Sequence, residues 1–233
     1  MSDIITDRQL SDMFDELGKS YGFKRTTASF TEYRDVKVNW TRSTNGEGSW
    51  IDFMISDYLR DVPADLVRQI GETILYRTTH PTEDVPLPPA VNKYLANDDF
   101  SKKHRDTYLS RLETTNDGPH GEAKCLDKLW NELIDEGYVD SDDDMQLVWG
   151  FCGKNKPCMV STLMKVIVMS DYLDDGYVPD DVIKFLLYYE YLFYKEGLYY
   201  FDSGEKIDRE KIMRKYPDCA KLRNTIRSMG YSI

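Results

Sequence analysis

An internal repeat limits the folds open to this chain more than any other feature of its sequence. The tetrapeptide Ser-Asp-Tyr-Leu occurs at 56–59 and again at 170–173, each time after a run rich in apolar residues and a few residues before a proline. Such runs, bounded by turn residues, are typical of strands, and a proline, Pro63 or Pro179, suits the start of a helix. The sequence therefore predicts the same strand and the same helix twice.

Helix patterns upstream extend the repeat. Apolar side chains recur there at intervals of three and four residues, which is the spacing of one helix face. They are Leu10, Met13, Phe14 and Leu17 in the first copy and Leu126, Leu129, Trp130 and Leu133 in the second. A further strand is predicted at 36–40 in one copy and at 146–149 in the other, each followed by a turn. We therefore expect an α+β fold in which helix, strand, strand and helix occur twice, the first half being the more diverged.

The repeated Ser-Asp-Tyr-Leu has a structural interpretation. Ser or Asp at the end of the strand is expected to cap a short turn, because both side chains accept hydrogen bonds from free amides. The Tyr and Leu that follow are expected to anchor the turn in the core. No catalytic role is predicted for Ser56 or Ser170, since no His accompanies either serine in a triad pattern.

The chain is predicted to have three parts, with the first copy at 1–77, a linker with a helix at 78–118 and the second copy at 119–233. Four prolines between 81 and 89 remove amide donors and bias that stretch against helix. An apolar edge favours a helix at 90–112. The two copies are therefore expected to form separate halves.

The spacing of cysteine and histidine predicts no metal site. Cys152 and Cys158 form a C-x5-C pair in a turn, unlike the C-x2-C pair of a zinc knuckle, and two ligands would still be missing. Because no secretion signal is found, the four cysteines, which include Cys125 and Cys219, are predicted to be reduced. The histidines are predicted to be scattered surface residues, and they are His80, His104 and His120.

Charge and hydropathy exclude several classes of partner. The net charge of −11 argues against a general nucleic-acid binder, which needs a basic field around the phosphates. One local excess of positive charge lies between 205 and 227; it predicts the solvated face of a helix or, as the alternative, a DNA-binding segment. Its cations include Lys206, Arg209, Lys211, Arg214 and Lys215. No apolar run spans a bilayer and no signal peptide is indicated, so we expect a cytoplasmic protein with no membrane partner.

The helix after Pro179 carries the segment Tyr-Tyr-Glu-Tyr-Leu-Phe at 188–193. Upstream, one predicted strand ends at Trp149, a second ends at Ser170, and a linker with Leu-Asp and Val-Pro follows at 173–179. In order and spacing these features resemble the SprT-like branch of the zincin metallopeptidases, whose helix carries Tyr-His-Glu-Leu-Leu-His. The resemblance covers about half of the chain and implies a zincin-like, SprT-like second half.

The resemblance also implies that the zinc site is lost. In this family two His, four residues apart, bind zinc, and the Glu beside the first acts as general base on the metal-bound water. Tyr189 and Phe193 stand at the two ligand positions and leave Glu190 as a remnant. The third family ligand, a His ahead of an aromatic-Pro pair, falls between 203 and 211, where the chain has no His. We therefore expect no bound metal, no cofactor and no hydrolysis.

These arguments predict a pseudo-metallopeptidase that binds a protein or peptide without cutting it. Aromatic side chains in and after the motif either line a groove or fill the core where zinc and its ligands stood. The candidate groove residues are Tyr188, Tyr191, Tyr194 and Tyr199. Two alternatives remain open: an enzyme that uses Glu190 and the nearby tyrosines without zinc, or with a metal recruited through Cys219, and a DNA-associated protein.

Overall fold

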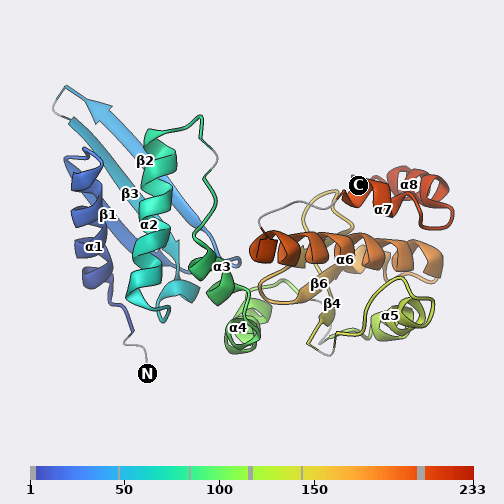
Figure 1. Cartoon of the computed structure of the whole chain (residues 1–233). Coiled ribbons are helices and arrows are strands. Elements are labelled where there is room, and N and C mark those ends of the chain that lie inside the picture. The colour runs from blue at the N-terminus through green and yellow to red at the C-terminus, as the bar shows by residue number, and fades with distance from the viewer. Residues whose placement is uncertain (1–3, 47, 84, 115–117, 143, 204–207) are drawn as a thin grey trace. The chain divides into compact units, whose positions relative to one another are not determined.

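The computed structural model describes residues 4–46, 48–83, 85–114, 118–142, 144–203 and 208–233, with the backbone alone for 198–203. The chain divides into two compact units, Met1–Leu95 and Ala96–Ile233 (Figure 1). Each unit contains helices and a three-stranded sheet. The predicted α+β class is thereby confirmed.

The first unit is built on a sheet in the order β1-β3-β2, with β1 parallel to β3 and β2 antiparallel to it. Its elements are α1 (Asp7–Ser20), β1 (Arg25–Thr31), β2 (Val38–Asn45), β3 (Gly48–Ser56), a 3-10 turn (Asp57–Leu59), α2 (Ala64–Thr79) and α3 (Pro89–Leu95). Phe14 of α1 packs on Phe53 of β3. Because Gly71 has no side chain, α2 can approach the Phe14 ring closely. The two helices therefore close one hydrophobic core with this sheet.

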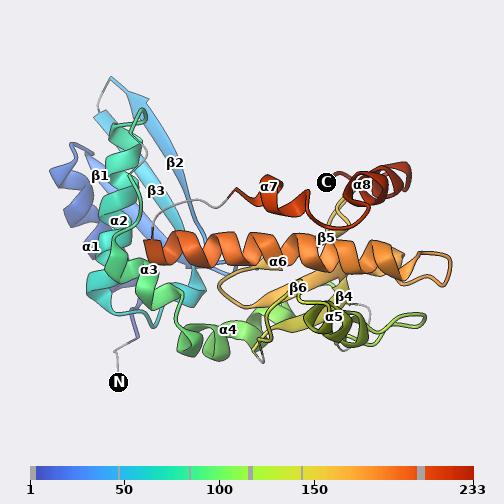
Figure 2. The ribbon, with the colours of Figure 1, turned by 45° about the vertical axis from the view of Figure 1, so that its right-hand side comes forward.

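The second unit repeats this sheet in the order β4-β6-β5, again with one parallel and one antiparallel pair. Its elements are α4 (Asp98–Ser110), α5 (Leu126–Asp135), β4 (Gln146–Gly150), β5 (Cys158–Ser161), β6 (Val166–Ser170), a 3-10 turn (Asp171–Leu173), α6 (Asp180–Ser203), α7 (Arg209–Met213) and α8 (Cys219–Ser228). Figure 2 shows α6 lying along this sheet. Trp149, Ile167 and Phe185 are buried between the sheet and its helices.

Equivalent main-chain hydrogen bonds show how closely the two sheets correspond. The Ser56 amide donates to the Lys37 carbonyl at 2.9 Å, and the Ser170 amide donates to the Pro157 carbonyl at 2.8 Å. In both units the strand then leads into a 3-10 turn and a long helix that begins directly after a proline. The repeat found in the sequence is thus a repeat of the folded structure.

Each sheet has one strand more than the sequence pattern predicts. The pattern misses β1 because its sequence, Arg-Thr-Thr-Ala-Ser-Phe-Thr, contains few apolar residues, and it misses β5 because those four residues directly follow a turn with Gly and Pro. The predicted strand at 36–40 is β2, which occupies the place of β5 in the repeat. Its predicted equivalence with 146–149 was therefore wrong, since β4 is equivalent to β1.

The two Ser-Asp-Tyr-Leu turns have the same backbone but different anchors. Neither Ser56 nor Ser170 caps its turn through the side chain, so the serine half of the predicted Ser-or-Asp cap was wrong. In the second turn the Asp171 side chain accepts a hydrogen bond from the Tyr172 amide at 3.0 Å. Tyr58 is buried as predicted, whereas Tyr172 is 74% exposed. The Leu is the apolar residue that is buried in both turns, and it anchors both.

The predicted helix at 90–112 is two helices, α3 and α4. They separate at Asn97, whose side-chain oxygen accepts a hydrogen bond from the Asp99 amide at 3.0 Å and caps α4. His104 in α4 is buried beside the Phe100 ring, which corrects its prediction as a surface residue. His80 is exposed and stacks on Tyr76. Within the described ranges, no helix is both long enough and apolar enough to cross a membrane.

Candidate functional site

The site is built on α6, the helix predicted to carry the degenerate motif. Asp180 and Asp181 lie in its first turn, where their charge is favourable for the helix dipole. Most of the residues that follow are buried against the sheet and α5, with Phe185, Leu186 and Leu187 fully enclosed. This packing fixes the rotation of the helix about its axis, and it directs the side chain at 190 towards β5.

Glu190 lies in an almost fully buried position, 6% exposed, beside the Cys158 thiol of β5. The two side chains share a hydrogen bond. Burial raises the pKa of Glu190 to about 7, although the hydrogen bond with Cys158 acts in the opposite direction. Burial and the adjacent Glu190 also raise the pKa of Cys158. Near neutral pH the carboxyl group therefore exchanges its proton, while the thiol keeps its own.

A cavity of about 300 Å³ opens at this carboxyl group. Its walls come from α6, from β5 with the residues just before it, and from the end of the described chain. The lining residues are Lys156, Pro157, Cys158, Met159, Val160, Tyr189, Glu190, Phe193, Ser232 and Ile233. The three residues that the family resemblance singled out thus line one cavity.

Aromatic rings occupy the two positions that the sequence resemblance predicts as lost zinc ligands. The Tyr189 and Phe193 rings meet edge to face, with centroids 4.9 Å apart. The Arg209 guanidinium lies 3.3 Å from the centroid of the Phe193 ring and also pairs with Glu196. Within the described residues, no group of three or more His, Cys, Asp or Glu side chains is placed to hold a metal ion. The two rings form a side wall of the cavity, and the arginine lies against the Phe193 ring.

The outer edge of β5 lies beside the same cavity. Because the Ser170 amide bonds to the Pro157 carbonyl, and because such pairs alternate along an antiparallel ladder, Met159 also faces β6. The main-chain N–H and C=O groups of Cys158 and Val160 therefore point away from the sheet. In the part of the chain that the structure describes, no further strand pairs with this edge.

The tyrosines predicted to line a groove lie in the core instead. Tyr188 stacks on Tyr216, with centroids 5.0 Å apart. The Tyr191 and Tyr194 hydroxyls donate hydrogen bonds of 2.7 and 2.8 Å to carboxylates in the loop before β4, and all three rings are buried. The side chain of Tyr199 lies outside the described residues. These three rings fill the core, which is the alternative to a groove that the sequence left open.

Sequence reasoning missed the β5 half of the site. Cys158 and Val160 lie in a strand that the pattern does not reveal, so nothing in the sequence placed them opposite Glu190. Helix spacing is the signal available for the other half, since positions 189, 190 and 193 share one side of a helix. That spacing identifies the α6 wall of the cavity and leaves the β5 wall unknown.

The basic C-terminal segment is divided between paired and exposed cations. Arg209 is held by Glu196, and Arg223 bonds to both carboxylate oxygens of Glu210 at 3.0 and 3.1 Å. Among the candidate nucleic-acid contacts, Lys211, Arg214 and Lys215 are exposed, while Lys206 lies outside the described residues. Pairing with acids reduces the positive field that a DNA-binding surface requires.

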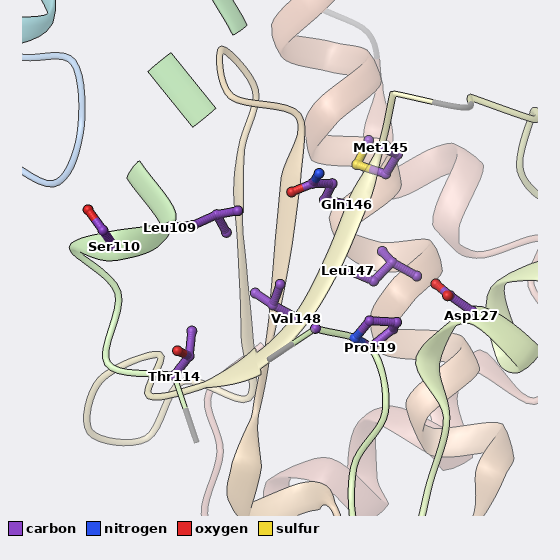
Figure 3. Close-up of a pocket in the computed structure, with 10 residues that line it drawn as sticks. Leu109, Ser110, Thr114, Pro119, Asp127, Met145, Gln146, Leu147 and Val148 are labelled. Carbon is purple, nitrogen blue, oxygen red and sulfur yellow. The ribbon is translucent and has the colours of Figure 1, made fainter. Parts of the chain in front are cut away.

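A larger cavity, about 590 Å³, lies at the β4 edge of the sheet. Figure 3 shows Leu109 reaching from the end of α4 towards β4, with Val148 and Thr114 nearby. Apolar and polar side chains both line it, and among its lining residues there is one carboxylate, Asp127, but no thiol or imidazole. Because a carboxyl group that titrates near neutral pH meets a thiol at Glu190 and Cys158, the smaller cavity is the candidate site.

Comparison of this chain with known protein families, with curated proteins and with solved structures gave no match.

Proposed function

We propose that the second unit is a non-catalytic peptide-binding module that accepts an extended segment along the outer edge of β5. The observation that carries the proposal is the position of this open strand edge beside the cavity of Tyr189, Glu190 and Phe193. Strand addition needs only main-chain groups on the receiving edge and a pocket for alternate side chains. The outer edge of β5 offers such main-chain groups, and the cavity beside it is such a pocket.

The pairing has a defined register. The free N–H and C=O groups of Cys158 and Val160 offer two donors and two acceptors to an incoming strand. Alternate side chains of that strand point to the same face, so one of them is positioned to enter the cavity. The Tyr189 and Phe193 rings favour an apolar or aromatic side chain there, because they contribute buried area and ring contacts.

Descent from a SprT-like metallopeptidase is part of the proposal. The order of elements supports it, since β4 ends just after Trp149, β6 ends at Ser170, and α6 begins after Pro179 with Glu190 on its cavity side. Hydrolysis is not expected, because Phe193 has no lone pair for zinc and a neutral phenol such as Tyr189 is a poor ligand. On this proposal the groove of the ancestral enzyme still binds a peptide but no longer hydrolyses it.

A proline at Val160 tests the strand-addition step. Val160→Pro removes one outward amide without removing a bond to β6, and edge strands tolerate proline at such positions. The matched control is Trp40→Pro, because Trp40 of β2 pairs with Phe53 as Val160 pairs with Ile167. The probe is a displayed library of random extended peptides, panned on the full chain, followed by titration of the strongest binders.

We expect Val160→Pro to weaken those peptides by about tenfold or more, which is the loss of about 1.4 kcal/mol, and Trp40→Pro to leave affinity unchanged. Equal binding to the wild type and Val160→Pro, or a library without binders, would overturn the proposal. Elemental analysis tests the non-catalytic part, since one zinc ion per purified chain would contradict it.

A second candidate function has one specific observation in its favour. Glu190 has a pKa of about 7 and faces a cavity, and such a carboxyl group is suited to general acid–base chemistry at neutral pH. Glu190→Gln separates the two functions, because the amide keeps the shape of the side chain but cannot exchange a proton in this way. Peptide binding is expected to survive this substitution, whereas acid–base activity would be lost.

A further inference from the structure

A nucleophile and a base meet at the start of α5, away from the Glu190 cavity. The Cys125 sulfur lies 3.2 Å from Nδ1 of His120, which is within hydrogen-bond distance. The main chain also pairs these two residues in an antiparallel bridge. A thiol held against an imidazole is the arrangement that activates cysteine nucleophiles.

The loop between the two residues is fixed by one carboxylate. The Asp174 side chain accepts hydrogen bonds from three successive amides, those of Glu122, Ala123 and Lys124, and the last two measure 3.0 and 2.9 Å. The Leu126 amide donates to the Pro119 carbonyl at 2.9 Å and closes the base of the loop. These hydrogen bonds therefore fix the loop that joins the imidazole to the thiol.

The helix adds its own field at the sulfur. Cys125 is the N-cap residue of α5, and its side chain makes no capping hydrogen bond. A helix N-terminus carries a partial positive charge from its unpaired amides, and this charge stabilises a thiolate there. His120 and the helix therefore act in the same direction on the sulfur.

The other cysteines lack this combination. Cys152 and Cys158 are buried, and only Cys219 shares the partial exposure of Cys125. No imidazole is described beside Cys219 in the structured part of the chain. Cys219 is therefore a natural internal reference for Cys125 within one molecule.

We propose that Cys125 and His120 form a reactive thiol site that hydrogen peroxide oxidises. His120 Nδ1 takes the thiol proton, and the sulfur attacks one oxygen of the peroxide. The O–O bond breaks, the sulfur becomes a sulfenic acid, and the departing hydroxide takes up the proton and leaves as water. The sulfur is oxidised by two electrons and the peroxide is reduced by two, so no further reactant is needed.

The test compares Cys125 and Cys219 in the full native chain at pH 7. Iodoacetamide alkylation is followed by quantitative peptide mass spectrometry, and a parallel sample receives hydrogen peroxide and then dimedone. We expect Cys125 to react about ten times faster than Cys219, because both thiols stand at the start of a helix and only Cys125 has an imidazole within hydrogen-bond distance to accept its proton. Dimedone is expected mainly on Cys125.

Two variants test the role of the imidazole. His120→Asn is expected to bring Cys125 down to the rate of Cys219, whereas His80→Asn, which changes a histidine that contacts no cysteine, leaves the ratio unchanged. Continued protection of Cys152 and Cys158 shows that the variant is folded. Equal rates at Cys125 and Cys219 in the wild type, or an unchanged ratio in a folded His120→Asn, would overturn the proposal, and the wild-type measurement decides even where the variant fails to fold.

Discussion

The two units share one architecture but differ at the position where the second has its candidate site. Counted from the proline before each long helix, Glu190 in α6 corresponds to Ile74 in α2, and both are buried. In the first unit an apolar side chain completes a core, whereas in the second a carboxyl group meets a thiol and a cavity. The comparison shows that the fold itself does not need the carboxyl group, which is therefore better explained by the site than by stability.

The face of the sheet turned away from the long helix differs as well. Asp52 on β3 is exposed, whereas Val166, its counterpart on β6, is fully buried. The start of β6 is tied to α4, since Arg105 donates to the Met164 carbonyl at 2.8 Å and Lys165 pairs with Asp98 at 2.9 Å. One sheet is thus covered on one face and the other on both.

Transferring the carboxyl group to the first unit is expected to have the largest effect. Ile74→Glu places a charge among the buried apolar side chains of the first unit, and an unpaired buried charge costs about 3–5 kcal/mol. Urea denaturation measures the loss, and hydrogen exchange is expected to locate it in the first unit. Ile74→Val is the control and costs about 1 kcal/mol. If Ile74→Val lowers the free energy of unfolding as much as Ile74→Glu does, then lost packing, rather than the buried charge, explains the destabilisation.

Removing the charge from the second unit is expected to stabilise it in a pH-dependent way. The pKa of Glu190 rises from 4.5 to about 7 on folding, so the folded state holds the proton more tightly. Wild-type stability therefore falls as the pH rises from about 4.5 to about 7, by about 3 kcal/mol. Glu190→Gln lacks this loss, and its advantage over the wild type is expected to grow between pH 4 and pH 8. An advantage that does not change with pH would show that Glu190 is not the titrating group.

The contact between α1 and α2, which corresponds to the contact between α5 and α6 in the second unit, offers the next test. Gly71 in α2 corresponds to the buried Leu187 in α6, and a Cβ added at Gly71 would lie 2.8 Å from the Phe14 ring. Gly71→Ala is therefore expected to destabilise the first unit by about 1–3 kcal/mol through overpacking, despite the better helix propensity of Ala. A thermal or urea midpoint above that of the wild type would show that Phe14 moves aside freely.

How far the sequence predicts this structure follows from the same comparison. Both amphipathic helices, the strand before each Ser-Asp-Tyr-Leu and the proline helix starts are local patterns, and all of them are confirmed. β1 has few apolar residues and pairs with β3 further along the chain, whereas β5 is only four residues long and pairs with the adjacent β6, so no local pattern marks either strand. The meeting of Glu190 with Cys158, like that of His120 with Cys125, depends on where the chain returns in space, which periodicity does not encode.

The smallest expected effects come from one ion pair that both units contain. Arg68 of α2 pairs with Glu16 at 2.9 Å, and its counterpart Lys184 of α6 pairs with Glu132 at 3.5 Å and also with Glu136. The Arg68 side chain is 38% exposed and the Lys184 side chain 10%, so water screens the first pair more. Each cation pairs with two carboxylates, since Arg68 also contacts Glu72 at 3.5 Å, so exposure alone distinguishes them. We expect Lys184→Met to cost about 1 kcal/mol because Lys184 is the less exposed cation, and Arg68→Met to shift the urea midpoint less. Added salt is expected to reduce the difference in urea midpoint between the wild type and Arg68→Met at a lower concentration than the difference between the wild type and Lys184→Met. If the Lys184→Met difference is reduced at the lower salt concentration, the two pairs are not equivalent parts of one repeated unit.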